Sequence, residues 1–299
     1  MVAIGIDIGG TRLKVGRVQE GYIVQRASAE TPHDFDELVN RLAALVTEVA
    51  DGREGVPVAA GVPGVFDDEQ SMVLASPNLT FTINKPLRDR LSEAIGVKVR
   101  LGNDASVAGL AEKVYGNGEN HSHFLLATLG TGIGGGLILN DHLWEGSAGM
   151  AGEFGHLGVG GAFEKENIWQ CGCGNYGCTE TFASASRMEQ RGYKLCGIDS
   201  LPELADLARN GDEAALSVFQ DAGKALGEGF AQVVLLLDIR VMLIGGGASP
   251  VIDLLREPLL DQVVARCDGR LRENFIIEKA LLGNDAGLLG AAALALESP

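Results

Sequence analysis

A histidine and three cysteines in the middle of the chain have the residue types and spacing of a metal site. The sequence places His156 ahead of Cys171, Cys173 and Cys178, with glycines between the cysteines. One imidazole and three thiolates complete the tetrahedral coordination of Zn²⁺, and four protein ligands leave no open position for a reacting water. Because glycine lets the chain turn tightly around one ion, we predict a structural zinc knot. A redox-active thiol cluster is the alternative.

Two carboxylates lie next to this cluster. Glu153 precedes His156 by three residues, and Glu180 follows Cys178 by two. Carboxylates held on a rigid element suit sugar hydroxyls, which carry no charge and are recognised through directional hydrogen bonds. For either carboxylate alone, a solvated surface position explains the sequence at least equally well.

Three glycine-rich turns each follow a short apolar run: Asp7-Ile8-Gly9-Gly10-Thr11, 130–136 and 245–247. Such glycines let backbone amides approach a phosphate, and a carboxylate such as Asp7 can hold Mg²⁺ through water. Each turn alone also fits a β-hairpin or a helix N-terminus. No Walker A lysine is present and a strand is expected after 130–136, which disfavours P-loop and dinucleotide-binding sites.

A further carboxylate lies where a predicted strand gives way to a predicted helix. Asn103 and Asp104 follow the apolar run ending at Leu101 and precede an alanine-rich segment. At such a corner Asp104 could accept a proton from a substrate hydroxyl. An ordinary helix N-cap explains the same residues equally well.

The elements that must position these residues follow from hydrophobic periodicity. We expect strands at 2–8, 13–18, 22–28, 56–61, 97–101, 124–129, 137–139 and 241–244. We expect helices at 35–49, 87–95, 105–114, from 184 to 237 with an interruption at 192–200, from about 250, and at 286–296. A strand, a glycine turn and a second strand open each half, which weakly indicates an internal duplication and suits two lobes of related topology.

Composition narrows the classes of function. The chain has 299 residues, 42 of them glycine, a formal charge of −16 and 5% aromatic residues. The acidic balance makes a nucleic-acid partner improbable. Neither a secretory signal nor a membrane-spanning run is apparent, so we expect a cytoplasmic protein with no membrane partner.

Taken together, three stretches make the chain resemble the ROK family of bacterial sugar kinases and related repressors. They are Asp7–Thr11, Glu153–His156 and Cys171–Glu180, and the resemblance covers essentially the whole chain. It implies an α/β, two-lobed actin-like and hexokinase-like ATPase fold with ribonuclease H-like repeats and a ligand cleft between the lobes. We place the N-terminal lobe at 1–114 with 287–299 and the C-terminal lobe at 115–286. The expected activity is ATP-dependent phosphorylation of a free hexose, with Mg²⁺ and structural Zn²⁺ as metals.

The resemblance also implies roles for individual residues. Asp104 would be the base that takes the proton of the attacking hydroxyl. The sugar would be bound by Asn78, Asn103, Asp104, Glu153, His156 and Glu180, with His156 also a zinc ligand. ATP and Mg²⁺ would be held by Asp7, Gly9, Gly10, Thr11, Lys14, Gly130, Thr131, Gly132 and Gly246.

One departure from the family pattern bears on the acceptor. Many family glucokinases continue Asn-Leu with Pro-Gly-Trp, whereas this chain has Thr80-Phe81-Thr82 after Asn78-Leu79. Glucose is our first expectation, giving glucose 6-phosphate. N-acetylmannosamine, N-acetylglucosamine, mannose, fructose and allose stay open, as does ATP against polyphosphate as donor.

Two other functional classes share this core. A repressor of the family would need an N-terminal DNA-binding domain, for which a phosphate motif starting at Asp7 leaves no room. A sugar-binding protein without catalysis is the second alternative, although Asp7, Thr11 and Asp104 are all in place. The resemblance to the family further implies a homo-oligomer, either a dimer or a tetramer.

Overall fold

The computed structural model of the protein describes residues 1–147, 149–164 and 168–297, and the chain divides into two compact units. Unit 1 comprises Met1–Ser122, Gly136–Gly152 and Leu282–Pro299, and unit 2 comprises His123–Gly135 and Glu153–Leu281. Each unit is described by itself below.

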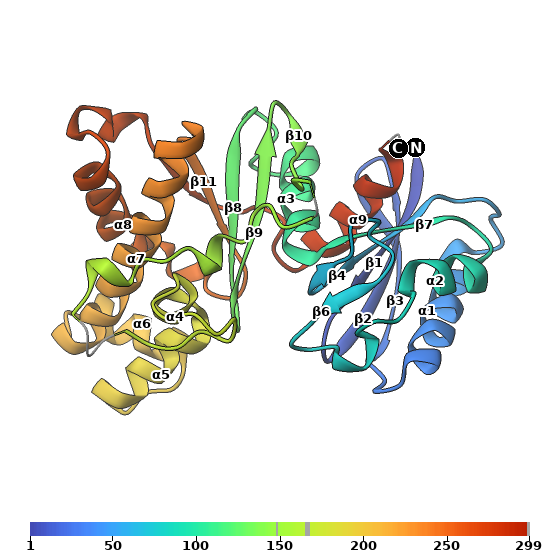
Figure 1. Ribbon diagram of the computed structural model, residues 1–299, viewed down its shortest axis with the longest axis horizontal. Coiled ribbons are helices and arrows are strands. Elements are labelled where there is room, and N and C mark those ends of the chain that lie inside the picture. Colours follow the sequence, from blue (N-terminus) through green and yellow to red (C-terminus); the bar gives the residue numbers. More distant parts are fainter. Residues whose placement is uncertain (148, 165–167, 298–299) are drawn as a thin grey trace. The chain divides into compact units, whose positions relative to one another are not determined.

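Unit 1 is built on a five-stranded mixed sheet of order β3-β2-β1-β4-β7 (Figure 1). Its strands are β1 (Val2–Ile8), β2 (Arg12–Gln19), β3 (Tyr22–Glu30), β4 (Val58–Val62) and β7 (Val99–Asn103). The first three are antiparallel neighbours, and β4 and β7 run parallel to β1. The carboxyl ends of β1, β4 and β7 therefore lie at one edge of the sheet, where ligands of open α/β sheets bind.

Alternation along β1 decides which helices cover which face of this sheet. Ile4, Ile6 and Ile8 are buried in the core formed with α1 (Phe35–Ala50) and α2 (Leu87–Ile95). Small residues on the opposite face admit α9 (Ala286–Leu296), whose backbone at Leu288 lies against Gly5 so closely that a side chain there would collide with it. Helix α3 (Asp104–Tyr115) packs on α9.

The second sheet has the order β10-β9-β8-β11-β12. Its strands are β8 (Phe124–Leu129), β9 (Ile133–Leu139), β10 (His142–Leu143), β11 (Val241–Gly245) and β12 (Ile276–Lys279). The helices of unit 2 are α4 (Glu180–Ala183), α5 (Ala185–Cys196), α6 (Leu201–Arg209), α7 (Glu213–Leu237) and α8 (Ile252–Arg266). Figure 1 shows α7 and α8 side by side, in agreement with their extensive packing.

Short elements complete the chain. Unit 1 also contains β5 (Val65–Phe66), β6 (Val73–Ala75), and the 3₁₀ turns η1 (Thr80–Thr82) and η7 (Gly283–Asp285). Unit 2 contains the 3₁₀ turns η2 (Phe154–His156), η3 (Gly160–Ala162), η5 (Ser249–Val251) and η6 (Gly269–Asn274). Within the described residues, no helix is both long enough and apolar enough to cross a membrane.

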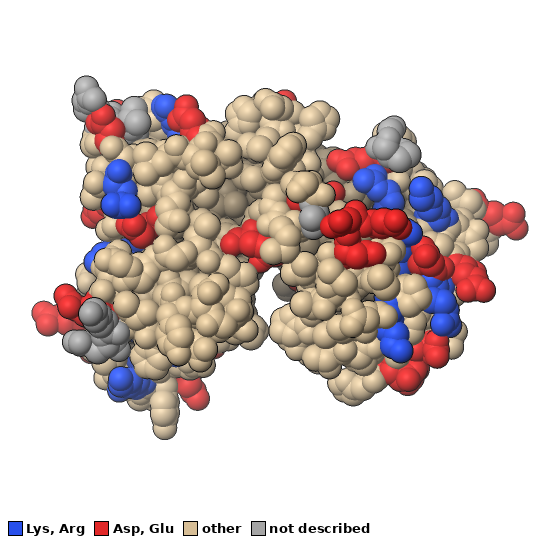
Figure 2. All heavy atoms as spheres, in the orientation of Figure 1, with Lys and Arg blue, Asp and Glu red and all other residues tan. Residues whose placement is uncertain are grey.

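The two sheets have the same strand order when their strands are numbered from the first of each: third, second, first, fourth, fifth. This shared order supports the internal duplication suggested by the repeated strand, glycine turn and strand. Figure 2 shows basic side chains interspersed with acidic ones on the visible face of the molecule. The formal charge of the whole chain is −16.

Residues 136–152 pack with unit 1, whereas the lobe boundaries expected from sequence placed them in the C-terminal lobe. The physical reason lies at Gly136 of β9 and Gly109 of α3. A Cβ added to Gly109 would lie 3.0 Å from the Cα of Gly136, so the two backbones touch where neither residue has a side chain. The boundaries of the lobes themselves stay a prediction.

Candidate functional site

The predicted zinc ligands are brought together by η2 and by the loop that follows it. The Sγ of Cys171 lies 3.5 Å from Nδ1 of His156, and the Sγ atoms of Cys173 and Cys178 are 3.7 Å apart. All four ligand atoms lie within 4.8 Å of one another. A tetrahedral Zn²⁺ with bonds of about 2.3 Å to sulfur and 2.0 Å to nitrogen would separate its ligands by about 3.5–3.8 Å. The donor set and its spacing therefore fit one zinc ion.

The backbone around the cluster explains why these side chains converge. The amide of Cys171 donates to the carbonyl of Asn175, and a β-bridge joins Gly158 to Cys178. Burial raises the pKa of the Cys171 thiol to about 12. A metal ion must displace that proton to bind. Because the ligands come together in the folded chain, metal binding in turn stabilises the fold.

Glu153 lies beside the imidazole that would bind the zinc. Residues 154–156 form a single 3₁₀ turn, which brings Oε2 of Glu153 to 3.7 Å from Nε2 of His156, beyond the reach of a direct hydrogen bond. The other ring nitrogen, Nδ1, is the one directed at Cys171. Nδ1 is therefore the nitrogen that would bind the zinc, and Nε2 faces the carboxylate.

Glu180 connects the zinc knot to the second glycine turn. Its Oε2 accepts a hydrogen bond of 2.9 Å from the amide of Ile133, and its Oε1 lies 3.4 Å from Sγ of Cys171. Gly132 lies against the same carboxylate, leaving no space there for a side chain. A residue expected only as a sugar ligand thus also holds the start of β9, a contact that no local sequence pattern predicts.

The turn at 130–132 is closed by its own backbone. The amide of Gly130 donates to the carbonyl of Gly132 at 2.9 Å, and Thr131 is exposed at the tip. The carbonyl of Gly130 accepts from the amide of Ala185, the first residue of α5, at 2.9 Å. The turn thereby lies beside the N-terminus of α5.

The third glycine turn also lies at the carboxyl end of β8. Gly246 has φ of +77° and its α-carbon packs directly on the backbone of Leu129, where a Cβ would lie 2.5 Å from the carbonyl oxygen. The amide of Ala248 donates to that same carbonyl at 3.0 Å. Only glycine fits position 246, for both reasons. The turns at 130–132 and 246–248 therefore lie side by side at the carboxyl end of β8.

In unit 1, the first glycine turn adjoins Asn78. A Cβ added to Gly10 would lie 2.9 Å from the Cβ of Asn78, so the two residues are in contact. Nζ of Lys14 donates to Oδ2 of Asp7 at 2.9 Å, and Thr31 fixes the turn by donating to the carbonyl of Gly9. The carboxylate of Asp7 at a strand end is a ligand type that suits Mg²⁺.

The structure decides which of Asn103 and Asp104 caps α3. Oδ1 of Asn103 accepts from the amides of Ala105 and Ser106, and its Nδ2 donates to the carbonyl of Gly64 at 3.1 Å. Asn103 is the N-cap, which confirms the capping interpretation of this pair for Asn103. Asp104 is the first residue of α3 and is exposed.

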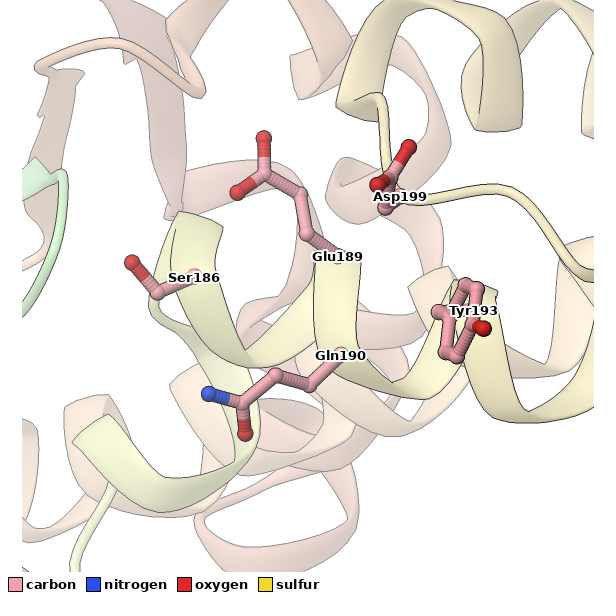
Figure 3. A pocket seen from close by; sticks show the side chains of 5 residues that line it. All are labelled: Ser186, Glu189, Gln190, Tyr193 and Asp199. Carbon is pink, nitrogen blue, oxygen red and sulfur yellow. The ribbon is translucent and has the colours of Figure 1, made fainter.

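One group of polar residues was missed from the sequence. Ser186, Glu189, Gln190 and Tyr193 of α5, with Asp199 after it, line a hollow of about 420 Å³ in unit 2 (Figure 3). Polar side chains on an amphipathic helix are indistinguishable by sequence from an ordinary solvated face. The hydrogen bond between Ala185 and Gly130 connects them to the second glycine turn.

Comparisons with known proteins agree with this geometry. The sequence model of the ROK family matches residues 3–298. A glucokinase of Thermotoga maritima is 36% identical, over 98% of this chain and 97% of the relative. An N-acetyl-D-glucosamine kinase of Histophilus somni is 33% identical, over 98% of each chain. A ROK family glucokinase of Streptomyces griseus, solved in complex with glucose and AMPPNP, is 32% identical with a TM-score of 0.80, over 98% of this chain and 99% of that structure.

Proposed function

Because the chain belongs to the ROK family and has its two-lobed actin-like ATPase fold, we propose that it is an ATP-dependent sugar kinase whose acceptor is glucose and whose product is glucose 6-phosphate. The observation that carries this proposal is the contact of Glu180 with both Cys171 and the amide of Ile133. One carboxylate thereby ties the zinc knot, where three of the proposed sugar ligands lie, to a proposed phosphate-binding turn.

The proposed residues come from both units. Unit 1 supplies the base and part of the sugar and phosphate contacts: Asp104, Asn78, Asn103, Asp7, Gly9, Gly10, Thr11 and Lys14. Unit 2 supplies the zinc ligands and the remaining contacts: His156, Cys171, Cys173, Cys178, Glu153, Glu180, Gly130, Thr131, Gly132 and Gly246. Zinc in the knot would act only on structure, since four protein ligands close its coordination.

Asp104 is the residue that we assign as the base. Its carboxylate accepts the proton of the attacking sugar hydroxyl, while that oxygen forms a bond to the γ-phosphorus of ATP. The bond from this phosphorus to the bridging oxygen breaks, and ADP leaves with the electron pair. Because the transition state is loose, alignment by Asn78, Asn103 and the glycine turns matters more than the strength of the base. Bound Mg²⁺ would neutralise phosphate charge, and Asp7 is the residue that would hold it through water.

A kinase acting on an N-acetylated hexosamine is the second candidate. The Histophilus somni relative supports it at 33% identity, and so does the segment that follows Asn78. That segment forms η1, in which buried Thr82 donates to the carbonyl of Leu79 and Phe81 packs edge-on to His33. These contacts hold the loop in place, and its side chains differ from the Pro-Gly-Trp of many family glucokinases.

The test is ADP release with Mg-ATP, coupled to a spectroscopic readout, for glucose, N-acetylglucosamine, N-acetylmannosamine, mannose, fructose and allose. We expect glucose to give the highest kcat/KM. A higher value for an N-acetylhexosamine would reassign the acceptor within the same reaction. No turnover on any sugar, together with thermal stabilisation by one of them, would instead favour a sugar-binding protein without catalysis.

We further propose that the protein works in the cytoplasm as a homo-oligomer. ATP and the free thiols that zinc requires are both typical of a reducing compartment. Leu235, Leu236 and Leu237 at the end of α7 are 64%, 81% and 40% exposed, and apolar side chains grouped in this way favour self-association. Sedimentation of the wild type and of Leu236→Glu tests this: a monomeric wild type would refute it.

A further inference from the structure

The end of the second glycine turn touches both chain segments that carry proposed sugar ligands in unit 2. The amide of Ile133 donates to Oε2 of Glu180 at 2.9 Å. The carbonyl oxygen of Ile133 lies against Gly155, so closely that a Cβ at Gly155 would collide with it. Gly155 stands between Glu153 and His156 in the chain. The backbone of one buried residue, Ile133, therefore supports all three of these ligands.

The backbone on either side of Glu180 is held in place. The amide of Thr179 donates to the carbonyl of Leu157 at 2.9 Å, and Oγ1 of Thr181 donates to the carbonyl of Cys178 at 2.7 Å. Both threonines are buried. The position of the Glu180 carboxylate therefore depends on its own side-chain torsions and on the atoms of the glycine turn.

Gly132 limits where this carboxylate can lie. A Cβ added to Gly132 would collide with Oε2 of Glu180 and lie 3.2 Å from its Cδ. The three nearest atoms all belong to the end of the Glu180 side chain. The φ of Gly132 lies outside the left-handed region, so the backbone itself admits an alanine. A methyl group at position 132 would thus displace the carboxylate without forcing the fold to shift.

We propose that the turn at 130–132, together with Ile133, is a positioning element of the sugar site: it holds the Glu180 carboxylate where a sugar hydroxyl donates to it. The inference rests on the proposed function, which supplies Glu180 as a sugar ligand and the turn as a phosphate ligand. It goes beyond that function by giving Gly132 and the amide of Ile133 a role in binding the acceptor.

The chemistry of a carboxylate allows this double role. Its two oxygens offer about four lone-pair sites, so Glu180 can accept from the Ile133 amide and from a sugar hydroxyl together. Phosphoryl transfer depends above all on the alignment of donor and acceptor. A turn that touches the donor's phosphates and also sets a sugar ligand would keep the two substrates aligned with each other.

The test measures sugar binding by calorimetry on the zinc-loaded protein without nucleotide, so that neither phosphate binding nor turnover contributes. The probe is glucose or, if another of the six sugars in the ADP-release assay binds the wild type more tightly, that sugar. The variant is Gly132→Ala. Gly161→Ala is the matched control, because Gly161 is an exposed residue of η3 in the same unit with open space around its α-carbon.

We expect Gly132→Ala to raise the Kd for the sugar about tenfold, the factor expected for a misplaced hydrogen bond to a charged group. Its melting temperature should stay within about 2 °C of the wild type, since the displaced atoms are the end of a side chain. The Gly161→Ala control should change the Kd by less than about twofold.

Glu180→Asp supplies a second measurement that a general effect on the fold would not reproduce. It shortens the side chain by one methylene group, which makes room for a methyl group at position 132. Glu180→Asp alone should weaken sugar binding. In its background, Gly132→Ala should change the Kd by less than about a further twofold, because two substitutions that act through one contact are not additive.

The proposal is overturned if Gly132→Ala binds the sugar as tightly as the wild type, or if its loss of affinity recurs in full in the Glu180→Asp background. Either result beside sugar-dependent ADP release by the wild type would remove the positioning role and leave the kinase. The expected pattern of affinities without turnover on any sugar would keep the positioning role and remove the kinase. A wild type that binds none of the six sugars would contradict both.

Discussion

Asn103 and Asp104 are adjacent in the sequence but occupy different positions at the start of α3: the first is the N-cap and the second is the first helical residue. Asn103 accepts from two amides at the start of α3 and donates to Gly64, and Asp104 begins the helix as an exposed carboxylate. The sequence placed both residues at the start of a helix, where an ordinary N-cap and a proton-accepting carboxylate explained them equally well. The donation from Nδ2 of Asn103 to the carbonyl of Gly64 is a contact that the sequence could not predict.

We predict that Asn103→Ala destabilises the protein by about 1–2 kcal/mol, the usual cost of removing an N-cap. Chemical denaturation followed by circular dichroism measures this. Asn103→Asp is the matched control: it keeps the capping acceptor, loses only the donor to Gly64, and should cost less. An alanine variant as stable as the wild type would show that the cap is unimportant.

The ion pair of Arg26 with Asp285 gives stability a defined pH dependence. Both guanidinium nitrogens donate to the carboxylate, at 2.6 and 2.7 Å, and these hydrogen bonds hold the pKa of Asp285 below its ordinary value. A carboxylate with a lowered pKa in the folded state stabilises the protein above its unfolded pKa of about 3.9. That contribution is lost as the pH falls through the lower, folded-state pKa.

We therefore predict that Arg26→Gln is less stable than the wild type at pH 7 and that the difference in unfolding free energy shrinks as the pH falls below about 3.9, the ordinary pKa of an unfolded aspartate. The difference should be small, since both side chains are partly exposed. Denaturation curves between pH 2.5 and 7 measure it, with Arg256→Gln, at an exposed position of α8, as the control. A difference that stays constant over this range would contradict the linkage.

At the scale of elements, the zinc knot has little regular secondary structure. Turns and isolated β-bridges shape its backbone, and Cys171 and Cys178 are buried. Sequence spacing predicted the four ligands, because the chemistry of zinc dictates their types. It could not predict that Glu180 would join the knot to β9, since the partner of Glu180 is a backbone amide.

We predict that the Cys171→Ser variant loses bound zinc and melts roughly 5–10 °C below the wild type. Sugar binding should also weaken, because the metal no longer joins η2 to the segment before α4. Metal analysis and thermal melting measure these effects. Cys196→Ser is the matched control, since Cys196 lies outside the cluster. A zinc-free variant with the stability and sugar affinity of the wild type would refute the structural role.

Helix α3 is anchored at its far end by a buried carboxylate. Glu112 is fully buried: its Oε1 accepts from the amide of Leu282 at 2.8 Å and its Oε2 from the amide of Asn117 at 3.0 Å. Leu282 is the residue at which the chain re-enters unit 1. Glu112 therefore fixes the helix that carries Asp104 to that returning segment.

We predict that Glu112→Gln destabilises the protein by about 1–3 kcal/mol, because an amide can accept at only one end and leaves a buried N–H without its acceptor. Denaturant titration measures the loss. Glu119→Gln, at an exposed position just beyond the helix, should change stability by less than about 0.5 kcal/mol. Equal stability of the two variants would contradict the anchoring role.

Some elements deviated from expectation. Gly192 was expected to interrupt a helix, but it lies inside α5, where it leaves space for the side chain of Leu204. The actual second break falls at 210–212, where Asp212 caps α7 by accepting from Ala215. Strand β12 was missed because it is short and half charged, and it forms by pairing with β11. Tertiary contacts decide the first and third cases, and a local cap decides the second.

At the scale of the whole molecule, the repeated motif in the sequence corresponds to two sheets with one strand order. Each half opens with a strand and a glycine turn, and the sequence was sufficient to predict both. It could not predict which residues lie beside each turn: Asn78 contacts Gly10, and Leu129 contacts Gly246. Those neighbours come from distant positions in the chain, and no local pattern encodes them.

The most direct test of the account compares Asp104→Asn with the wild type in sugar-dependent ADP release, with glucose affinity measured in parallel by calorimetry. If Asp104 is the base of a sugar kinase, turnover falls by about 10²–10⁴, the usual contribution of general base catalysis, while the Kd for glucose changes by less than about threefold. Turnover close to that of the wild type, with glucose still bound, would contradict the assignment of Asp104 and the mechanism built on it.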